Sequence, residues 1–309
     1  MSSRKPQPAP VSRPQTPGRA QPPTVSGRWL LIAVSLSVMG AAVCGWGALC
    51  LLFWQGSWQL LYHPSAKVAR TPVSAGLAFE PIGFAVTTAG QPRLQGWLIP
   101  AAPGARFSQY TVLYLHGRNG NLGDTVPELA RLHAVGVNVF AFDYRGYGQS
   151  QFAHPSEARW RQDTGWALQY LTGTRMIAPR AIVLDGEGLG ANLALEVAAA
   201  HPELAGVVIE APLEAPVNAI FNDPRARLVP AHLLVRDRYV LNGPAAALRI
   251  PSLWFLPAPA ESEAGHSGKP SEAFREVRAA KTLVWLPPSG AVEKSYTDAI
   301  SRWLEDAVR

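Results

Sequence analysis

The sequence predicts an α/β fold in which a mostly parallel, twisted sheet carries helices on both faces. From about residue 76 onward, short continuous apolar runs alternate with segments of helical periodicity. Strands buried on both faces are apolar throughout, and their alternation with helices is typical of parallel sheets. One uncharged apolar segment precedes these elements. We therefore expect a single transmembrane helix ahead of the folded domain.

The expected elements follow the periodicity of the chain. Residues 77–87 and 93–99 alternate apolar with polar or small residues and predict a leading antiparallel hairpin. Continuous apolar runs predict strands at 110–116, 137–143, 181–185, 206–210, 252–256 and 282–286. Helical patterns lie near 124–135, 157–172, 189–200, 271–279 and 292–307. Residues 212–249 contain several prolines and predict a small helical lid over the carboxyl edge of the sheet.

Residues 1–28 predict a disordered, basic, proline-rich tail. They contain five Lys or Arg, seven Pro and no acidic residue. The whole chain has 28 basic and 22 acidic residues, so the remainder is nearly neutral. The high pI thus comes from the tail, and we expect no nucleic-acid partner. The tail is either a solvated cytoplasmic leader or a proline-motif ligand.

Residues 29–54 are uncharged and long enough to span a bilayer. Arg28 precedes this segment, while Trp54, Trp58 and Tyr62 suit the opposite interface. The positive-inside rule predicts a single-pass protein of the cell membrane with a cytoplasmic N-terminus and residues 58–309 as an extracytoplasmic domain, periplasmic in a Gram-negative bacterium. The alternative is a cleaved signal peptide, against which the length of the apolar run argues.

Cysteine and histidine patterns support neither a metal site nor a cofactor. Both cysteines, Cys44 and Cys50, lie inside the apolar segment, so the domain has no disulfide or thiolate nucleophile. The seven histidines show no metal-ligand spacing, and there is no dinucleotide or phosphate-loop motif. We therefore expect no metal and no cofactor.

Gly188 stands where a strand, a glycine-rich turn and a helix follow one another. The strand at 181–185 leads into Gly186-Glu187-Gly188-Leu189-Gly190, and the helix at 189–200 follows. This is the context of a nucleophile elbow, Gly-x-Ser-x-Gly, in which the serine is exposed at the tip of a strained turn. The flanking glycines Gly186 and Gly190 are present, but Gly188 has no group that attacks a carbonyl.

Several motifs of the chain resemble those of the α/β-hydrolase superfamily, in particular membrane-anchored hydrolases of the serine-aminopeptidase type. They are Leu61-Tyr62-His63-Pro64-Ser65, Gly96-Trp97-Leu98-Ile99-Pro100, His116-Gly117-Arg118-Asn119-Gly120 and Asp143-Tyr144-Arg145-Gly146-Tyr147-Gly148. The resemblance implies an α/β-hydrolase fold from about residue 58 onward, with Ser, Asp and His in that order as nucleophile, orienting acid and base. Carried over by position, these three roles fall on Gly188, Ala260 and Ala291, so the resemblance implies a pseudoenzyme.

The resemblance also implies a retained oxyanion hole. The backbone N–H groups of Leu189 and of Arg118 or Asn119 would form it. His116 and Gly117 would shape its loop, and Gly186 and Gly190 would keep the turn tight. Glu187, one residue before the tip, is expected to point away from the site.

Two classes of function stay open. The first is a catalytically inactive, membrane-anchored protein that binds a small acyl or carboxylate ligand or a protein partner, or that keeps its pocket only as a scaffold. The second is an active ester, thioester or peptide hydrolase with a displaced catalytic set. A nucleophile with a histidine in hydrogen-bond reach near Leu189 would favour the second class.

Overall fold

The computed structural model describes residues 26–257, 271–286, 292–306 and 308. The chain divides into two compact units, Met1–Ala48 and Leu49–Arg309. Helix α1 (Gly27–Gly56) contains the apolar run and continues into the 3-10 turn η1 (Ser57–Leu60). Its apolar side chains are almost all exposed. By length and composition, α1 is the helix of the described residues that can cross a membrane.

An eight-stranded sheet forms the centre of the second unit. Its order is β10-β9-β8-β7-β4-β6-β3-β2. The strands from β10 to β6 are parallel, whereas β2 and β3 form an antiparallel hairpin against β6. The bounds are β2 (Glu80–Val86), β3 (Pro92–Ile99), β4 (Thr111–Leu115), β6 (Asn138–Asp143), β7 (Ile182–Glu187), β8 (Gly206–Glu210), β9 (Ser252–Pro257) and β10 (Lys281–Leu286). The predicted α/β class and the leading hairpin are confirmed.

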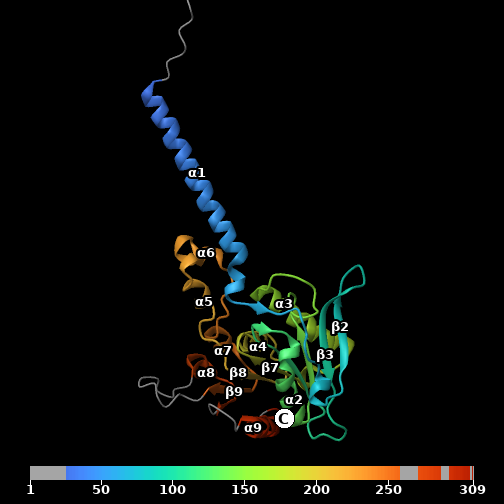
Figure 1. Ribbon diagram of the computed structural model, residues 1–309. Coiled ribbons are helices and arrows are strands. Elements are labelled where there is room, and N and C mark those ends of the chain that lie inside the picture. The colour runs from blue at the N-terminus through green and yellow to red at the C-terminus, as the bar shows by residue number, and fades with distance from the viewer. Residues whose placement is uncertain (1–25, 258–270, 287–291, 307, 309) are drawn as a thin grey trace, which may run out of the picture. The chain divides into compact units, whose positions relative to one another are not determined.

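Helices cover both faces of this sheet (Figure 1). They are α2 (Val126–Val135), α3 (Glu157–Gln169), α4 (Leu189–Ala200), α8 (Glu272–Glu276) and α9 (Val292–Asp306). A π turn, η4 (Tyr170–Thr174), extends α3. The lid region consists of short elements, α5 (Asn218–Phe221), η6 (Pro224–Leu228), α6 (Ala231–Leu234) and α7 (Asn242–Ala247). Its prolines explain the short elements, because proline within a helix removes a backbone donor and clashes with the preceding turn.

Two apolar cores lie on opposite faces of the sheet. Leu113 and Leu115 of β4 contribute to the core under α3 and α4, whereas Val112 and Tyr114 contribute to the core under α2 and α9. This alternation follows from the two-residue period of a strand.

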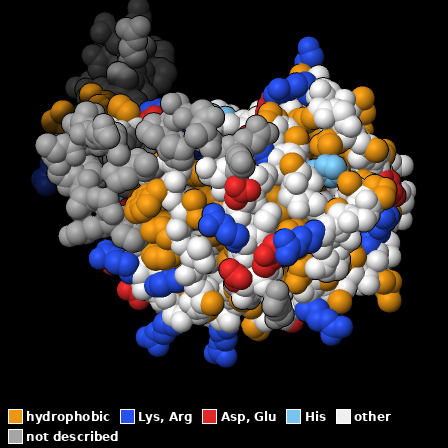
Figure 2. Space-filling view, turned by 90° about the horizontal axis from the view of Figure 1, so that it is seen from below, with side chains coloured by type: hydrophobic (Ala, Val, Ile, Leu, Met, Phe, Trp, Pro, Cys, Tyr) orange, Lys and Arg blue, Asp and Glu red, His pale blue; other side chains and the backbone are white. Residues whose placement is uncertain are grey.

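Figure 2 shows the domain from below, which is the side where α9 lies in Figure 1. Basic and acidic side chains are interspersed on this side.

A small two-stranded sheet attaches the chain after α1 to the edge of the domain. Strand β1 (His63–Pro64) pairs in parallel with β5 (Asn119–Gly120). Leu61 and Tyr62, just before β1, are buried. Short 3-10 turns complete the fold at η2 (Pro72–Ala75), η3 (Leu122–Thr125) and η5 (Pro179–Ala181). Because β5 follows β4, this pairing brings the segment after α1 to the carboxyl edge of the parallel strands.

Candidate functional site

The turn between β7 and α4 has a strained backbone at Gly188. Its φ is 56° and its ψ is −117°, a conformation that residues with a side chain rarely adopt. The backbone N–H of Gly188 donates to the carbonyl oxygen of Glu210 at 2.8 Å, which fixes the turn against the end of β8. A sharp strand-to-helix turn of this kind exposes its central residue at the top of the sheet. Gly188 presents only hydrogen there.

The two flanking glycines permit close packing of the turn. A Cβ at Gly186 would overlap the carbonyl of Gly190, and a Cβ at Gly190 would overlap the carbonyl oxygen of Leu115. At Gly188 the situation is different, because a Cβ would meet no atom of the described residues within 4 Å. Gly186 and Gly190 are therefore required by packing, whereas Gly188 is required only by its backbone conformation.

A cavity of about 360 Å³ lies over the turn, and we name it the elbow cavity. The loop after β4, the start of α2, the elbow and the lid line it, through Gly117, Arg118, Asn119, Asp124, Thr125, Glu128, Glu187, Gly188, Leu189 and Leu213. No serine, cysteine or histidine belongs to this lining within the described part of the chain. The expectation for Glu187 is wrong, since this residue lines the cavity. Its Oε2 accepts a hydrogen bond from the hydroxyl of Tyr114 at 2.8 Å.

The backbone groups expected to form an oxyanion hole meet at this cavity. Arg118 and Asn119 come from the loop after β4, and Leu189 begins α4. A first helical residue has an N–H without an intrahelical acceptor, and the positive end of the helix dipole adds to its field. These donors can therefore polarise a carbonyl oxygen. The cavity also contains Glu128 and Glu187, whose carboxylates disfavour an anion.

His116 is buried beneath the loop rather than exposed in the cavity. Its Nδ1 lies 2.7 Å from the carbonyl oxygen of Gly117, and its ring packs 4.6 Å from that of Tyr144. Burial lowers the pKa of His116 to about 4 and raises the pKa of Asp143 to about 7. Between these values both groups are neutral. The 3.6 Å between Nε2 and the Asp143 carboxyl is thus a polar contact and not an ion pair.

A buried carboxyl cluster under the elbow was missed by the sequence reasoning. The hydroxyl of Tyr296 lies 2.5 Å from Glu210 Oε1 and 3.2 Å from Asp185 Oδ2. The guanidinium of Arg131 stands 4.4 Å over the Tyr296 ring. Burial raises the pKa of Asp185 and that of Glu210, the latter to about 7, so a proton is held between them near neutrality. One feature of the sequence could have indicated this cluster. Asp185 lies inside an apolar strand, and Glu187, two residues later, lies on the same face of that strand.

Ala260 and Ala291, assigned by position to the acid and the base, lie outside the described residues.

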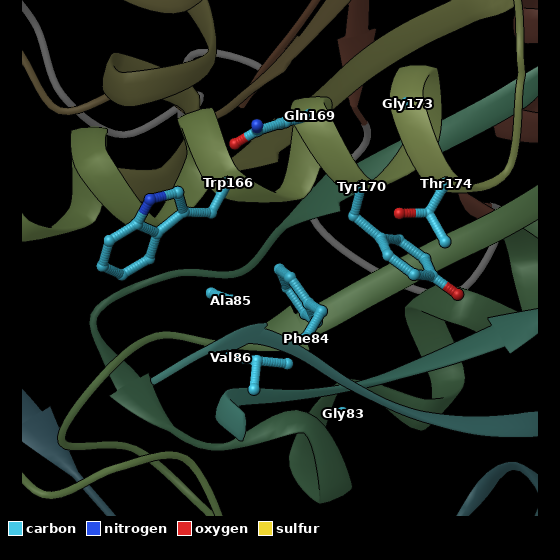
Figure 3. A pocket seen from close by; sticks show the side chains of 9 residues that line it. All are labelled: Gly83, Phe84, Ala85, Val86, Trp166, Gln169, Tyr170, Gly173 and Thr174. Atoms are coloured by element: carbon cyan, nitrogen blue, oxygen red, sulfur yellow. The ribbon is translucent and has the colours of Figure 1, made fainter. Parts of the chain in front are cut away.

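A second cavity, of about 500 Å³, lies between β2 and the end of α3 (Figure 3). Phe84, Trp166 and Tyr170 give it an aromatic lining, and no acid, histidine or cation is among the described residues that line it. The elbow cavity, which combines backbone donors with charged groups, is therefore the candidate functional site.

The sheet order and the elbow define the class of protein by its fold: the chain has an α/β-hydrolase fold. A family model described as serine aminopeptidase, S33, matches residues 108–247, which include the loop after β4, the elbow and most of the lid.

Relatives support the same assignment. The chain is 33% identical over 164 residues to the uncharacterized protein Rv2307c of Mycobacterium tuberculosis, covering 52% of this chain and 56% of that protein. It is 32% identical over 143 residues to the mouse alpha/beta hydrolase domain-containing protein 17C, covering 46% and 43%. The chain thus matches about half the length of these relatives. The Pyrococcus furiosus esterase Pf2001 superposes with a TM-score of 0.58 at 16% identity, covering 81% of this chain and 98% of the esterase, which shows the shared fold.

Proposed function

We propose that this protein is a membrane-anchored α/β-hydrolase-fold protein that binds its ligand in the elbow cavity without hydrolysing it. The observation that carries the proposal is Gly188 at the tip of an otherwise complete elbow. Acyl transfer in this fold needs a nucleophile at that tip and a base beside it. No serine, cysteine or histidine is part of the described lining of the cavity, which supports this proposal over a displaced catalytic set.

The ligand that fits best is a small neutral acyl compound, such as an ester, a thioester or an amide. Its carbonyl oxygen would accept from the N–H of Leu189 and that of Arg118 or Asn119. Among the described residues, no atom occupies the space where a serine side chain at position 188 would stand. A carboxylate ligand is less suitable because Glu128 and Glu187 face the same space.

The length and composition of α1 support anchoring of this cavity to the cell membrane. The basic tail before it favours a cytoplasmic N-terminus, and thus an extracytoplasmic domain.

A restoration experiment tests the absence of catalysis. The full chain in detergent is assayed with activated esters, thioesters and aminoacyl amides, beside the variant Gly188→Ser/Ala260→Asp/Ala291→His. We expect background rates from the native chain and measurable turnover from the triple variant, with Arg180→Gln as a matched neutral change. Turnover by the native chain well above background would overturn the proposal, and Glu187→Gln would then identify whether this carboxylate is responsible.

A further inference from the structure

The end of α1 is fastened to the edge of the sheet that carries the elbow cavity. His63 and Pro64 pair with the loop after β4, and the backbone N–H of His63 donates to the carbonyl oxygen of Arg118 at 3.0 Å. The ring of Trp58 stacks on that of His154 at 4.9 Å, in the loop after β6. Because these loops follow the carboxyl ends of parallel strands, the segment after α1 lies on the same edge as Gly188.

The position of the bilayer surface follows from the sequence of α1, and this step rests on the proposed anchor. The mostly apolar run ends at Trp54, and tryptophans at the ends of a span prefer the membrane interface. Trp54 and Trp58 both belong to the second compact unit, together with the loops that they contact. The side chains around them therefore lie at the depth of the lipid headgroups.

Large apolar side chains are exposed at this edge. Phe152 is 83% exposed and its ring lies 5.9 Å from that of His154, the residue stacked on Trp58. Leu233 of α6 is 81% exposed. In Figure 1, α3, α5 and α6 lie at the upper end of the domain, opposite α9. Aromatic and aliphatic groups that enter an interface beside basic groups are typical of membrane-contacting surfaces.

A cavity of about 760 Å³ opens among these groups, and we name it the anchor-end cavity. Its apolar walls include Trp54, Trp58 and Leu234. Its basic side chains are Arg159 and Arg236, which form no ion pair with the part of the chain that the structure describes. Asp237 is the one carboxylate among the described residues of the lining. It accepts hydrogen bonds from the hydroxyl of Tyr62 at 2.5 Å and from the backbone N–H of Glu157 at 3.2 Å.

We propose that the anchor-end cavity binds the headgroup of an anionic phospholipid from the leaflet that faces the domain. The two arginines without ion-pair partners would receive the phosphate, and the serine, glutamine and tryptophan side chains of the lining would contact the glycerol region. Phe152 and Leu233 would enter the interface on either side. This contact holds the elbow edge of the domain against the bilayer, so the elbow cavity receives its acyl ligand from the membrane.

The orientation is tested with the full chain in nanodiscs of phosphatidylcholine with increasing fractions of phosphatidylglycerol. In a Cys44→Ala/Cys50→Ala background, an environment-sensitive fluorophore is attached at Phe152→Cys or at Met176→Cys. Met176 is a matched control because it is 80% exposed and precedes β7, at the amino edge of the sheet. Lipids spin-labelled near the headgroup should quench the probe at 152 and leave the probe at 176 unquenched. Equal, weak quenching at both positions would overturn the proposal.

The headgroup site is tested by comparing spin-labelled phosphatidylglycerol with spin-labelled phosphatidylcholine as quenchers. We expect spin-labelled phosphatidylglycerol to quench the probe at position 152 more strongly than spin-labelled phosphatidylcholine does. Each arginine-to-glutamine change at Arg159 and Arg236 should lower this preference by about fivefold, as expected for one basic group near an anionic surface. Arg180 and Arg249 lie at the amino edge of the sheet, so the control variant Arg180→Gln/Arg249→Gln should leave the preference for phosphatidylglycerol unchanged. An unchanged preference in Arg159→Gln/Arg236→Gln would overturn the headgroup site.

The same samples separate this inference from the proposed anchor. A chain that comigrates with the nanodiscs but shows no quenching at 152 has a membrane span and a domain that does not contact the bilayer. A chain that fails to comigrate lacks the anchor itself, and the inference falls with it.

Discussion

The backbone N–H of Gly188 donates to the carbonyl oxygen of Glu210 at 2.8 Å, while the side chain of Glu210 is held by the hydroxyl of Tyr296 at 2.5 Å. The elbow is thus connected through β8 to a residue on α9. The same hydroxyl lies 3.2 Å from Asp185 Oδ2, so it links carboxyl groups on two adjacent strands. The strained turn and the buried carboxyl cluster form one connected structure.

Tyr296→Phe should therefore destabilise the domain. Loss of the hydroxyl removes the hydrogen-bond partner of Glu210 Oε1 and of Asp185 Oδ2 in a buried site, which costs about 1–3 kcal/mol. Chemical denaturation of the full chain in detergent measures the change. Tyr170→Phe is the matched control, because the Tyr170 hydroxyl has no hydrogen-bond partner among the described residues. Equal stability of the two variants would contradict the role of Tyr296.

The glycines of the elbow should respond differently to alanine. Gly190→Ala should cost more than about 3 kcal/mol, since its Cβ would overlap the backbone of Leu115. Gly188→Ala should cost only about 1–3 kcal/mol, the strain of a side chain at positive φ, because no described atom lies within 4 Å of the added Cβ. Thermal unfolding of both variants measures this order. The reverse order would mean that Gly188 is packed more closely than its geometry indicates.

Sequence reasoning predicted the layers of this fold but not all contacts of its site. The strands and Gly188 follow from local patterns, because periodicity and glycine spacing act within a few residues. The cluster of Asp185, Glu210 and Tyr296 joins residues more than eighty positions apart, so no local pattern contains it. The position of Glu187 was misjudged for the same reason, since the hydroxyl of Tyr114 on the neighbouring strand holds its carboxylate at the cavity.

Asp143→Asn should change the pH dependence of stability. The pKa of Asp143 is about 7 in the folded protein, above its usual value near 3.9, so the native state keeps a proton that the unfolded chain loses. Stability contributed by this group therefore falls as pH rises from about 4 to about 7. His116 acts oppositely, because its pKa of about 4 lies below its usual value near 6.5, and its contribution is lost as pH falls through that window.

The Asp143→Asn variant isolates the contribution of this carboxyl group to the pH dependence of stability. The unfolding free energy of Asp143→Asn, compared with that of the native chain, should gain a more positive slope of up to about 1.4 kcal/mol per pH unit between pH 4.5 and 6.5. His116 is retained in both proteins, so its opposing slope cancels in the comparison. Denaturation midpoints measured across this window provide the test. Parallel curves would show that Asp143 is ionised in the folded protein.

The charge of the elbow cavity should select neutral over anionic ligands. Hexanamide and hexanoate have similar shape, but the carboxylate would lie near Glu128 and Glu187. We expect hexanoate to bind at least about tenfold more weakly than hexanamide, because like charges in one site cost several kcal/mol.

In Glu128→Gln the difference in affinity between hexanamide and hexanoate should narrow. Glu128 is a suitable site for this change, since its buried Oε2 has no hydrogen-bond partner among the described residues. Glu276→Gln, on α8 and outside the cavity lining, should leave the ratio unchanged. Calorimetric titration of the full chain in detergent measures all three ratios, and tighter binding of hexanoate than of hexanamide to the native chain would reverse the assignment of the ligand.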